Sequence, residues 1–375
     1  PIQRIESYFF RFYTDRRRCQ PSIKPLEKST MRSGVLVSQA IASGELRRRN
    51  RMPLSAKNNS SKTGGDSIRR FLSAHGLLLI LAIGIIPAPV RSAIGQSAAK
   101  GQSTSEDKPL VAGDGAEIKT TYFKSTIGQE APVVILLHGK GGSRQVWKSY
   151  AESLQKEGYA VISVDLRGHG ESSGGSTRGK KGESGTPNAR EYLGMINGDM
   201  EAVKKFVFSE HQKKQLNMNK IGIVAADVST PVAICYADFD WSKPPYEDAA
   251  AVAQKTPKGQ DVQALILLSP ETSAAGINVS KSLTFLRNIS RPVFVAVGSK
   301  NKSDLSAATK VYEHLAPKKE KYIFIETFDT ALVGTDLLGK GLKLELAMKK
   351  FLGMYVKDYQ SAWRDRRSKL EIDSK

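Results

Sequence analysis

The chain of 375 residues carries a formal net charge of +20 and has a sequence pI of about 9.8. Residues 1–100 hold 18 of the 57 Lys and Arg but only 5 of the 37 Asp and Glu, so they carry +13 of this charge. The rest of the chain has no cluster of Lys and Arg with interleaved aromatic residues, which argues against a nucleic-acid-binding protein. Its two cysteines, Cys19 and Cys235, lie on either side of residue 100, so the sequence predicts no disulfide within the later part.

The first part of the chain predicts a leader in two segments. Residues 1–66 are basic and lack apolar periodicity. This is typical of a disordered leader or of a start assigned too far upstream, with Met52, or with less support Met31, as the first residue. Residues 67–95 combine a basic start, an apolar run of about ten residues and small residues after it, which is the pattern of a secretory signal peptide. They predict export to the periplasm or the extracellular space, with a membrane anchor over residues 71–86 as the alternative.

A single folded domain is expected over residues 112–356. One alternating segment predicts an edge strand, and short apolar runs rich in β-branched residues predict buried strands: 117–124 for the edge strand, then 132–137, 160–165, 220–226, 262–268, 292–297 and 321–328. Helical spacing lies between them over 146–157, 191–208, 228–236, 303–315 and 336–356. This alternation predicts an α/β fold, with a mostly parallel twisted sheet and helices on both faces.

Several segments around and within this domain are predicted to be irregular. Residues 96–111, rich in Ser, Gly, Gln and Lys, predict a flexible linker, and residues 357–375 predict a charged tail that continues the last helix into solvent. The stretch 269–289 is too short for a large cap domain. Ligands bind beyond the carboxyl ends of the strands in such sheets. We therefore expect loop 173–187 and the insertion 238–260 to shape any ligand or partner surface.

Three motifs within the domain carry a resemblance to a known family. Leu-Leu-His-Gly ends at Gly139, after a predicted strand, and Asp-Leu-Arg-Gly-His-Gly-Glu-Ser spans 165–172. Lys-Ile-Gly-Ile-Val-Ala-Ala-Asp-Val-Ser-Thr, at 220–230, predicts a strand that turns sharply into a helix. Over about 112–356 the chain resembles the α/β-hydrolase superfamily, in particular its esterases, lipases and peptidases. The resemblance implies the α/β-hydrolase fold.

The resemblance also assigns roles to residues of this sequence. The motif loops fall on His138, Gly139, Arg167, Gly168, His169 and Gly170, and the backbone amides of an oxyanion hole fall on Lys140 and Val228. We interpret His138 and His169 as residues that hold these loops in place. The family's catalytic triad falls on Asp227 in place of serine, on Asn301 in place of the acid, with Asp304 nearby, and on Val333 in place of histidine.

The distribution of histidines supports the loss of the triad. The five histidines are His75, His138, His169, His211 and His314, so none follows the last predicted strand. Without a base, a nucleophile is not activated and a covalent intermediate is not hydrolysed. The sequence therefore predicts an exported hydrolase-like protein without hydrolase activity, which binds a small molecule or a protein partner at the crevice beyond the strand ends.

Three alternatives stay open at this point. In the first, Asp227 is the nucleophile or base of a hydrolase for ester, amide or epoxide bonds, with a partner such as His169. In the second, Asp227 is only a helix cap. In the third, the chain has a structural role at the cell envelope. The sequence has no zinc-ligand spacing and no phosphate-binding glycine loop, so we expect neither a metal nor a cofactor. Membrane contact is expected only if the signal segment is retained.

Overall fold

The computed structural model describes residues 104–175 and 187–373. The predicted leader, the signal segment, the first part of the linker and most of loop 173–187 lie outside these residues. The described residues all belong to one unit, Ser92–Lys375. Among them, no helix has the length and the apolar character needed to cross a membrane.

An eight-stranded sheet lies at the centre of this unit, in the order β1-β2-β4-β3-β5-β6-β7-β8. β2 pairs antiparallel with β1 and β4, and the other pairs are parallel. The central strands are buried on both faces, as their continuous apolar runs predict, so the mostly parallel sheet is confirmed. The strands are β1 Ser105–Val111, β2 Glu117–Phe123, β3 Val133–Leu137, β4 Ala160–Val164, β5 Ile221–Ala226, β6 Val262–Leu268, β7 Val293–Gly298 and β8 Ile323–Phe328.

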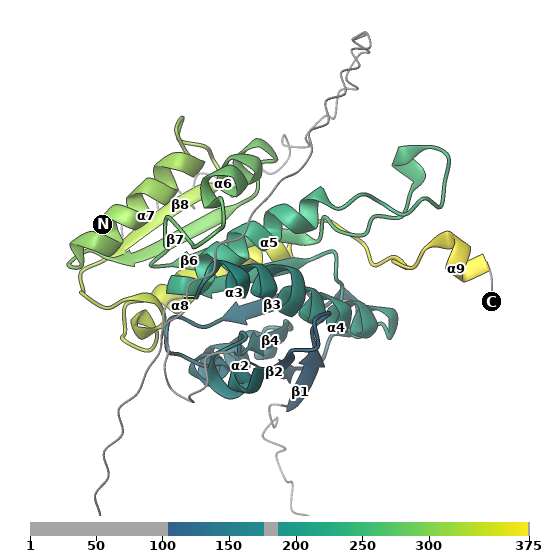
Figure 1. The fold of residues 1–375 in the computed structure, drawn as a ribbon, viewed down its shortest axis with the longest axis horizontal. Helices are drawn as coiled ribbons and strands as arrows, with labels where there is room; N and C mark the ends of the chain where they lie inside the picture. Colours follow the sequence, from purple (N-terminus) through teal and green to yellow (C-terminus); the bar gives the residue numbers. More distant parts are fainter. Residues whose placement is uncertain (1–103, 176–186, 374–375) are drawn as a thin grey trace, which may run out of the picture. The chain divides into compact units, whose positions relative to one another are not determined.

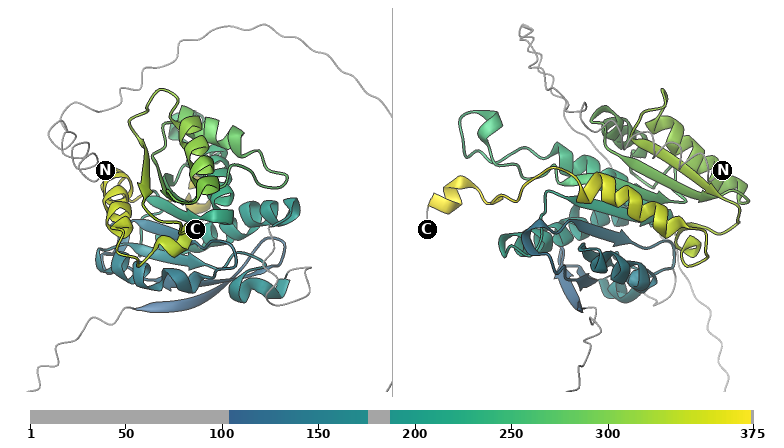
Figure 2. Two further views of the ribbon diagram at one scale, coloured as in Figure 1. Left: turned by 90° about the vertical axis from the view of Figure 1, so that its left-hand side faces the viewer. Right: turned by 180° about the vertical axis from the view of Figure 1, so that it is seen from behind.

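Helices cover both faces of the sheet (Figures 1 and 2). α2 and α8 bury their apolar sides in one core cluster, and α3 to α7 bury theirs in a second cluster on the other face. The helices are α2 Lys148–Lys156, α3 Ala189–Gly194, α4 Met200–Gln212, α5 Thr230–Ser242, α6 Val279–Asn288, α7 Lys302–Leu315, α8 Leu344–Leu352 and α9 Lys369–Asp373. Short 3₁₀ or π turns are η1 Gly128–Glu130, η2 Arg144–Trp147, η3 Gly170–Gly175, η4 Met195–Asp199, η5 Asp227–Ser229, η6 Val252–Gln254, η7 Gly334–Leu337 and η8 Gly353–Lys357.

All seven predicted strands are present, with ends within two residues of the expected ones. The prediction of an edge strand at 117–124 was wrong, because β1 pairs outside it. β1 lies within the range expected to be a linker. Its sequence, Ser-Glu-Asp-Lys-Pro-Leu-Val, is polar and its side chains are largely exposed, so backbone pairing holds it in place. α6 was not expected either. It is the only helix between β6 and β7, and no large cap covers the described part of the domain.

The C-terminal segment does not extend into solvent as predicted. Arg366 is only 2% exposed, and its guanidinium pairs with Asp261, at the start of β6. Trp363 donates from its indole nitrogen to the carbonyl of His211, at 3.1 Å. The segment packs because these partners are distant in sequence, which no local pattern could indicate.

The insertion after α5 was expected beside the carboxyl ends of the strands, but it lies beside their amino ends. It connects a helix to the start of β6, and all the parallel strands begin on that side of the domain. The insertion and α9 project from the domain together (Figures 1 and 2). Lys369 joins them, since its amide donates to Asp248 and its ammonium group donates to the carbonyl of Gln254, at 3.0 and 2.7 Å. The insertion therefore does not shape the crevice beyond the carboxyl ends of the strands.

Candidate functional site

The turn from β5 into α5 is a sharp corner. Asp227, the first residue after β5, has a φ of 53°, in the left-handed region that a non-glycine residue seldom adopts. Two hydroxyl groups fix the corner. Ser229 Oγ accepts from the amide of Ala226 at 3.0 Å, and Thr230 Oγ1 donates to the carbonyl of Asp227 at 2.7 Å. A strained residue at such a position is typical of functional sites, and it persists because the surrounding bonds hold it.

Small residues allow two other loops to approach this corner. A Cβ atom added to Gly139, after β3, would lie 3.4 Å from the Cβ of Asp227. A Cβ atom added to Gly334, after β8, would lie at the same distance, 3.4 Å. The amide of Gly334 donates to Ser269 Oγ at 2.9 Å, so the loops after β3, β5, β6 and β8 meet here.

The carboxylate of Asp227 accepts a hydrogen bond from the backbone amide of Lys140, at 3.1 Å. Lys140 carries one of the two amides that the sequence predicts for an oxyanion hole. The side chain at the corner therefore takes the place where such a hole would hold a negatively charged oxygen. Val228, which carries the other predicted amide, follows in η5 and is 3% exposed. Helix capping does not explain Asp227, because no side chain caps the first turn of α5.

A second carboxyl group, that of Glu271, lies beside Asp227. Glu271 follows β6, and its amide donates to Thr230 Oγ1 at 3.0 Å, which ties the loop to the corner. Burial, the charge of Asp227 and a side-chain hydrogen bond with Asp227 raise the pKa of Glu271 to about 7. Sequence reasoning missed Glu271, although its place just beyond a buried strand was a usable signal. At neutral pH about half of the Glu271 carboxyl groups therefore carry a proton.

Tyr192, on α3, belongs to the same neighbourhood. Its side chain is buried, and its hydroxyl group has no hydrogen-bond partner in the part of the chain that the structure describes. Burial raises the pKa of Tyr192, and the negative charges of Glu271 and Asp227 raise it further. The corner thus combines two carboxyl groups, one backbone donor and a nearby phenol.

The other two positions that the sequence predicts for the triad, Asn301 and Val333, carry neither a carboxyl group nor an imidazole. Asn301 caps α7, because its side-chain oxygen accepts from the amide of Asp304 at 3.3 Å, and its amide nitrogen donates to the carboxylate of Asp304 at 3.1 Å. Burial and, to a lesser extent, the charge of Asp227 raise the pKa of Asp304. Val333 directly precedes Gly334, so the loop after β8 does reach the corner, but its side chain at this position cannot transfer a proton.

The histidines of the two motif loops pack against each other, with ring centroids 5.1 Å apart. His138 Nδ1 lies 2.8 Å from the carbonyl of Gly139, and its Nε2 accepts from the amide of Leu166 at 3.3 Å. Burial lowers the pKa of His138 to about 4, so its ring is neutral. His169 Nδ1 lies 3.1 Å from the carbonyl of Arg167. Neither ring hydrogen-bonds to Asp227.

The remaining histidines lie elsewhere. His211 stacks on Trp363, and His314 contacts Thr284, while His75 lies outside the described residues. Within residues 104–175 and 187–373, no three His, Cys, Asp or Glu residues are arranged to hold a metal ion. No imidazole of the described residues is therefore in hydrogen-bond contact with the corner.

The Arg-Gly-His-Gly loop has a structural explanation. Arg167 forms ion pairs with Asp114 and Asp199, at 2.5 and 2.6 Å. Gly170 has a φ of 51°, and a Cβ atom there would lie 2.4 Å from the carboxyl group of Asp165. Only glycine fits this close approach.

The strand order, the sharp corner after β5 and the placement of the loops around it define an α/β-hydrolase fold. A family model described as the alpha/beta hydrolase fold matches residues 132–270. The predicted resemblance to the α/β-hydrolase superfamily is thereby confirmed, although no curated protein sequence matches the chain significantly.

Solved structures of three hydrolases are similar to this chain, two of them with a TM-score of 0.50. A carboxyl esterase from Bacillus coagulans is 11% identical with a TM-score of 0.50, over 68% of this chain and 99% of that one. An acylaminoacyl peptidase from Pyrococcus horikoshii is 15% identical with a TM-score of 0.50, over 70% of this chain and 43% of that one. A dienelactone hydrolase from Anabaena variabilis is 14% identical with a TM-score of 0.42, over 68% and 98%. At these identities the likeness concerns the fold alone.

Proposed function

We propose that this protein is an α/β-hydrolase-fold protein without hydrolase activity, which uses the crevice beyond the strand ends to bind a small molecule or a protein partner. One observation carries the proposal: the carboxylate of Asp227 accepts from the amide of Lys140. A substrate oxygen that develops negative charge needs this amide, and a carboxylate already bound there would also repel it. The corner keeps its geometry but presents the charge that the reaction has to stabilise.

The absence of a base at the corner supports the same proposal. Hydrolysis through a covalent intermediate needs a group that activates the attack and then directs water at the intermediate. Val333 and Asn301 cannot do this, and the carboxylate of Asp227 contacts no histidine in the described part of the chain. Removal of the base alone costs several orders of magnitude in rate in the serine–histidine–aspartate template.

The test uses the purified full chain with p-nitrophenyl acetate and butyrate, a small haloalkane and a small epoxide, beside an active esterase as positive control. We expect no turnover above the buffer rate. Saturable turnover that Asp227→Ala abolishes, and that Asp336→Ala at an exposed position retains, would refute the proposal. Turnover that persists in both variants would come from a contaminant, and repeat purification removes it.

One observation favours a second function, a hydrolase for ester, amide or epoxide bonds. Asp227 has the left-handed conformation of an exposed nucleophile, and Glu271, with a pKa of about 7, is a proton donor beside it. In this scheme Glu271, and not His169, is the partner of Asp227. Mass spectrometry after incubation with each substrate decides between the two functions. A covalent adduct on Asp227 supports the hydrolase, and an unmodified protein supports the binding function.

We also propose that the chain is exported, as residues 67–95 indicate, with residues 71–86 as a membrane anchor in the alternative case. Cell fractionation with N-terminal sequencing of the mature protein tests both. A mature N-terminus shortly after residue 95 supports cleavage. Recovery of the intact segment in the membrane fraction supports the anchor, and recovery of the intact segment in the cytoplasm contradicts export.

A further inference from the structure

The two edges of the eight-stranded sheet differ in how they are protected. The outer strand at one edge, β1, carries the charged residues Glu106, Asp107 and Lys108, and also Pro109, which has no amide hydrogen to donate. Charges and proline in an edge strand discourage pairing with another chain. At the other edge β8 has the sequence Ile-Phe-Ile-Glu-Thr-Phe, with a single charged residue and no proline. β8 therefore lacks the features that keep an edge strand unpaired.

The hydrogen bonds between β7 and β8 leave one side of β8 unpaired. β8 pairs with β7 alone, in parallel register. The carbonyl groups of Tyr322 and Phe328 accept from amides of β7 and of the residue after it, so the even-numbered residues of β8 bond to β7. The odd-numbered residues Ile325 and Thr327 direct their amide and carbonyl groups away from β7, and these groups have no hydrogen-bond partner among the described residues. Thr327 is exposed and Ile325 is half-buried, whereas the central strand β5 is buried throughout.

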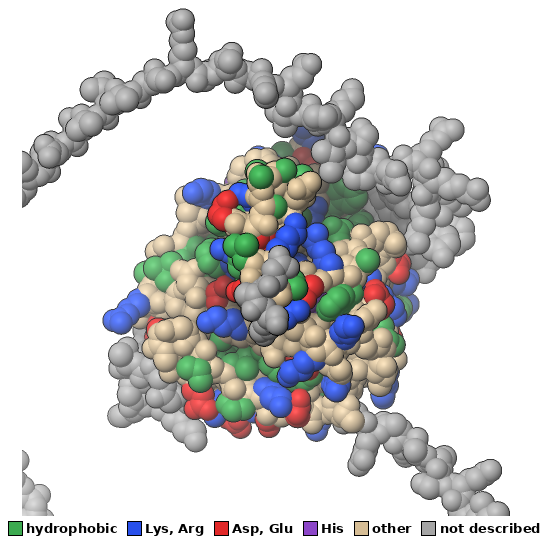
Figure 3. All heavy atoms as spheres, turned by 90° about the vertical axis from the view of Figure 1, so that its right-hand side faces the viewer, with side chains coloured by type: hydrophobic (Ala, Val, Ile, Leu, Met, Phe, Trp, Pro, Cys, Tyr) green, Lys and Arg blue, Asp and Glu red, His purple; other side chains and the backbone are tan. Residues whose placement is uncertain are grey.

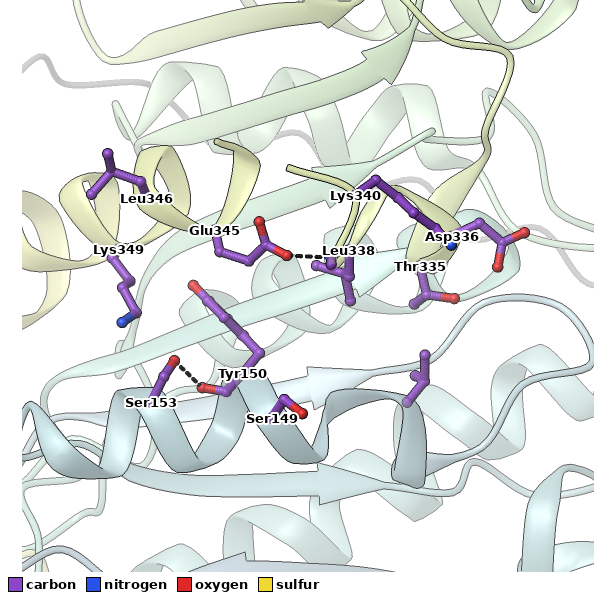
Figure 4. A pocket seen from close by; sticks show the side chains of 12 residues that line it. Ser149, Tyr150, Ser153, Thr335, Asp336, Leu338, Lys340, Glu345, Leu346 and Lys349 are labelled. Atoms are coloured by element: carbon purple, nitrogen blue, oxygen red, sulfur yellow. Dashed lines mark hydrogen bonds between the residues drawn. The ribbon is translucent and has the colours of Figure 1, made fainter. Parts of the chain in front are cut away.

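Two other surfaces of the described domain give no comparable indication of a partner. On the face drawn in Figure 3, apolar and charged side chains are interspersed, without a broad apolar patch. A pocket of about 650 Å³ lies between α2 and the start of α8, and its wall carries Asp336, Lys340 and Glu345, with charges of both signs (Figure 4). These charges select no class of ligand. The unpaired edge of β8 is more specific, because a row of backbone donors and acceptors fits another extended strand.

The direction of the unpaired groups restricts how a second copy of β8 pairs with the first. In an antiparallel pair related by a two-fold axis, the outward-facing residues of one copy bond to outward-facing residues of the other, so the axis passes through a residue. Pairs centred anywhere except on Ile325 or Glu326 join at most three residues of each six-residue β8. A pair centred on Glu326 places two carboxylates directly opposite each other, which is unfavourable. A pair centred on Ile325 joins five residues, Ile323 to Thr327, and keeps the carboxylates apart.

The register centred on Ile325 also brings opposite charges together. Lys321, just before β8, lies opposite Asp329, just after β8, in the other copy, and the two-fold axis repeats this pair. Both side chains are exposed, and Lys321 has no ion pair among the described residues. Lys300 contacts Asp329 at 3.2 Å within one copy, but the side chain of Asp329 stays 85% exposed and its carboxylate can take a second cation. Tyr322, which is 43% exposed, lies beside the end of β8 of the other copy in the same register.

We propose that the edge of β8 is an interface with a second copy of this chain, in which the two β8 strands pair antiparallel about Ile325. The two Ile325 residues exchange backbone hydrogen bonds, and the amide of each Thr327 donates to the carbonyl of Ile323 in the other copy. One continuous sheet then runs through both copies. Because their strands run in opposite directions, the crevices beyond the strand ends open on opposite sides of the dimer. The interface goes beyond the function proposed for the corner and does not depend on it.

Sedimentation of the purified full chain at protein concentrations from roughly 1 to 100 μM tests the proposal. We expect a monomer–dimer equilibrium with mainly dimer at about 100 μM. Lys321→Glu and Asp329→Lys should each raise the dissociation constant at least about tenfold, because the axis repeats each repulsive pair. The double variant with both changes restores opposite charges and should return to within about threefold of the native value. Lys108→Glu, the same change at the β1 edge, should leave the dissociation constant unchanged.

Hydrogen exchange shows whether β8 forms the interface. Exchange at the amides of Ile325 and Thr327 should slow at least about fivefold between roughly 1 and 100 μM protein, whereas exchange in β1 should not change. A dimer whose β8 amides exchange at the same rate at both concentrations overturns the proposal. So does a dimer that neither single charge change weakens, or a double variant that does not recover.

A chain that remains monomeric at about 100 μM also overturns the proposal. Slow exchange in β8 at every concentration would then indicate that another part of the chain covers the edge, and fast exchange would leave the edge to a strand of a different protein. None of these results depends on whether the protein hydrolyses esters or binds a ligand at the corner.

Discussion

Substitution of Glu271 by Gln tests whether the corner raises the pKa of this carboxyl group. Burial and Asp227 raise the pKa of Glu271 from 4.5 to about 7. A carboxyl group with a higher pKa in the folded than in the unfolded state binds its proton preferentially in the folded state. Its contribution to stability is therefore fully present below pH 4.5 and is lost as the pH rises through about 7.

The size of the effect follows from this shift. A pKa difference of one unit corresponds to about 1.4 kcal/mol, which sets a ceiling of roughly 3 kcal/mol on the change. Because Glu271 is only partly buried, solvent screens the interaction, and we expect about 1–2 kcal/mol. The free energy of unfolding of the native chain should fall by this amount, relative to Glu271→Gln, between pH 5 and pH 8.

Urea unfolding at several pH values gives the measurement, and the difference between the two proteins cancels the titration of other groups. Gln keeps the shape of Glu271 and cannot ionise, so the variant should gain relative stability as the pH rises. Glu313→Gln, at an exposed position on α7, is the matched control and should show no such trend. If the difference between the native chain and Glu271→Gln stays constant from pH 5 to pH 8, the pKa of Glu271 is not raised and the description of the corner is wrong.

Three other substitutions test separate features by urea unfolding at neutral pH. Asp227→Gly should stabilise the chain by about 1 kcal/mol, because glycine adopts the left-handed conformation without strain and the carboxyl group beside Glu271 is removed. A destabilised variant would show that the hydrogen bond to the amide of Lys140 outweighs the strain. Gly170→Ala should destabilise the chain by about 2 kcal/mol or more, because the added Cβ atom meets the carboxyl group of Asp165. Unchanged stability would contradict that contact. Arg366→Met should cost about 3 kcal/mol, because buried Asp261 loses one of its partners. Arg367→Met removes an ion pair that is only partly buried and should leave stability nearly unchanged. Equal effects of the two substitutions would contradict the burial of Arg366.

The parts of the fold that the sequence predicts are those that local patterns determine. Strands buried on both faces, such as β3 and β6, need continuous apolar runs, and these runs located them closely. β1 is polar and depends on pairing with β2, so nothing in its own sequence marks it as a strand. The C-terminal segment is held by Arg366 and Trp363 against residues more than a hundred positions away, which local reasoning cannot detect.

The candidate site was predicted in the same uneven way. The motifs located Asp227, Lys140 and the loop of Val333, because these positions follow directly from strands. Glu271 was missed because only the positions of the family's triad were considered after β6 and β7. The contact between two carboxyl groups depends on how the loops after β5 and β6 meet, and only the three-dimensional structure places them together.

The strained corner itself is weak support for an enzyme. The left-handed conformation of Asp227 is held by Ser229 and Thr230, by the close approach of the loops of Gly139 and Gly334, and by the packing of α5 on the sheet. These interactions connect β5 to α5 whether or not the side chain at the corner reacts. A chain that loses its nucleophile and its base can therefore keep the corner as part of its folding core. What distinguishes an enzyme is a free oxyanion site and a base within reach. Here the carboxylate of Asp227 itself accepts from the amide of Lys140, and the group beside it is the carboxyl group of Glu271, with no imidazole from the described part of the chain in contact.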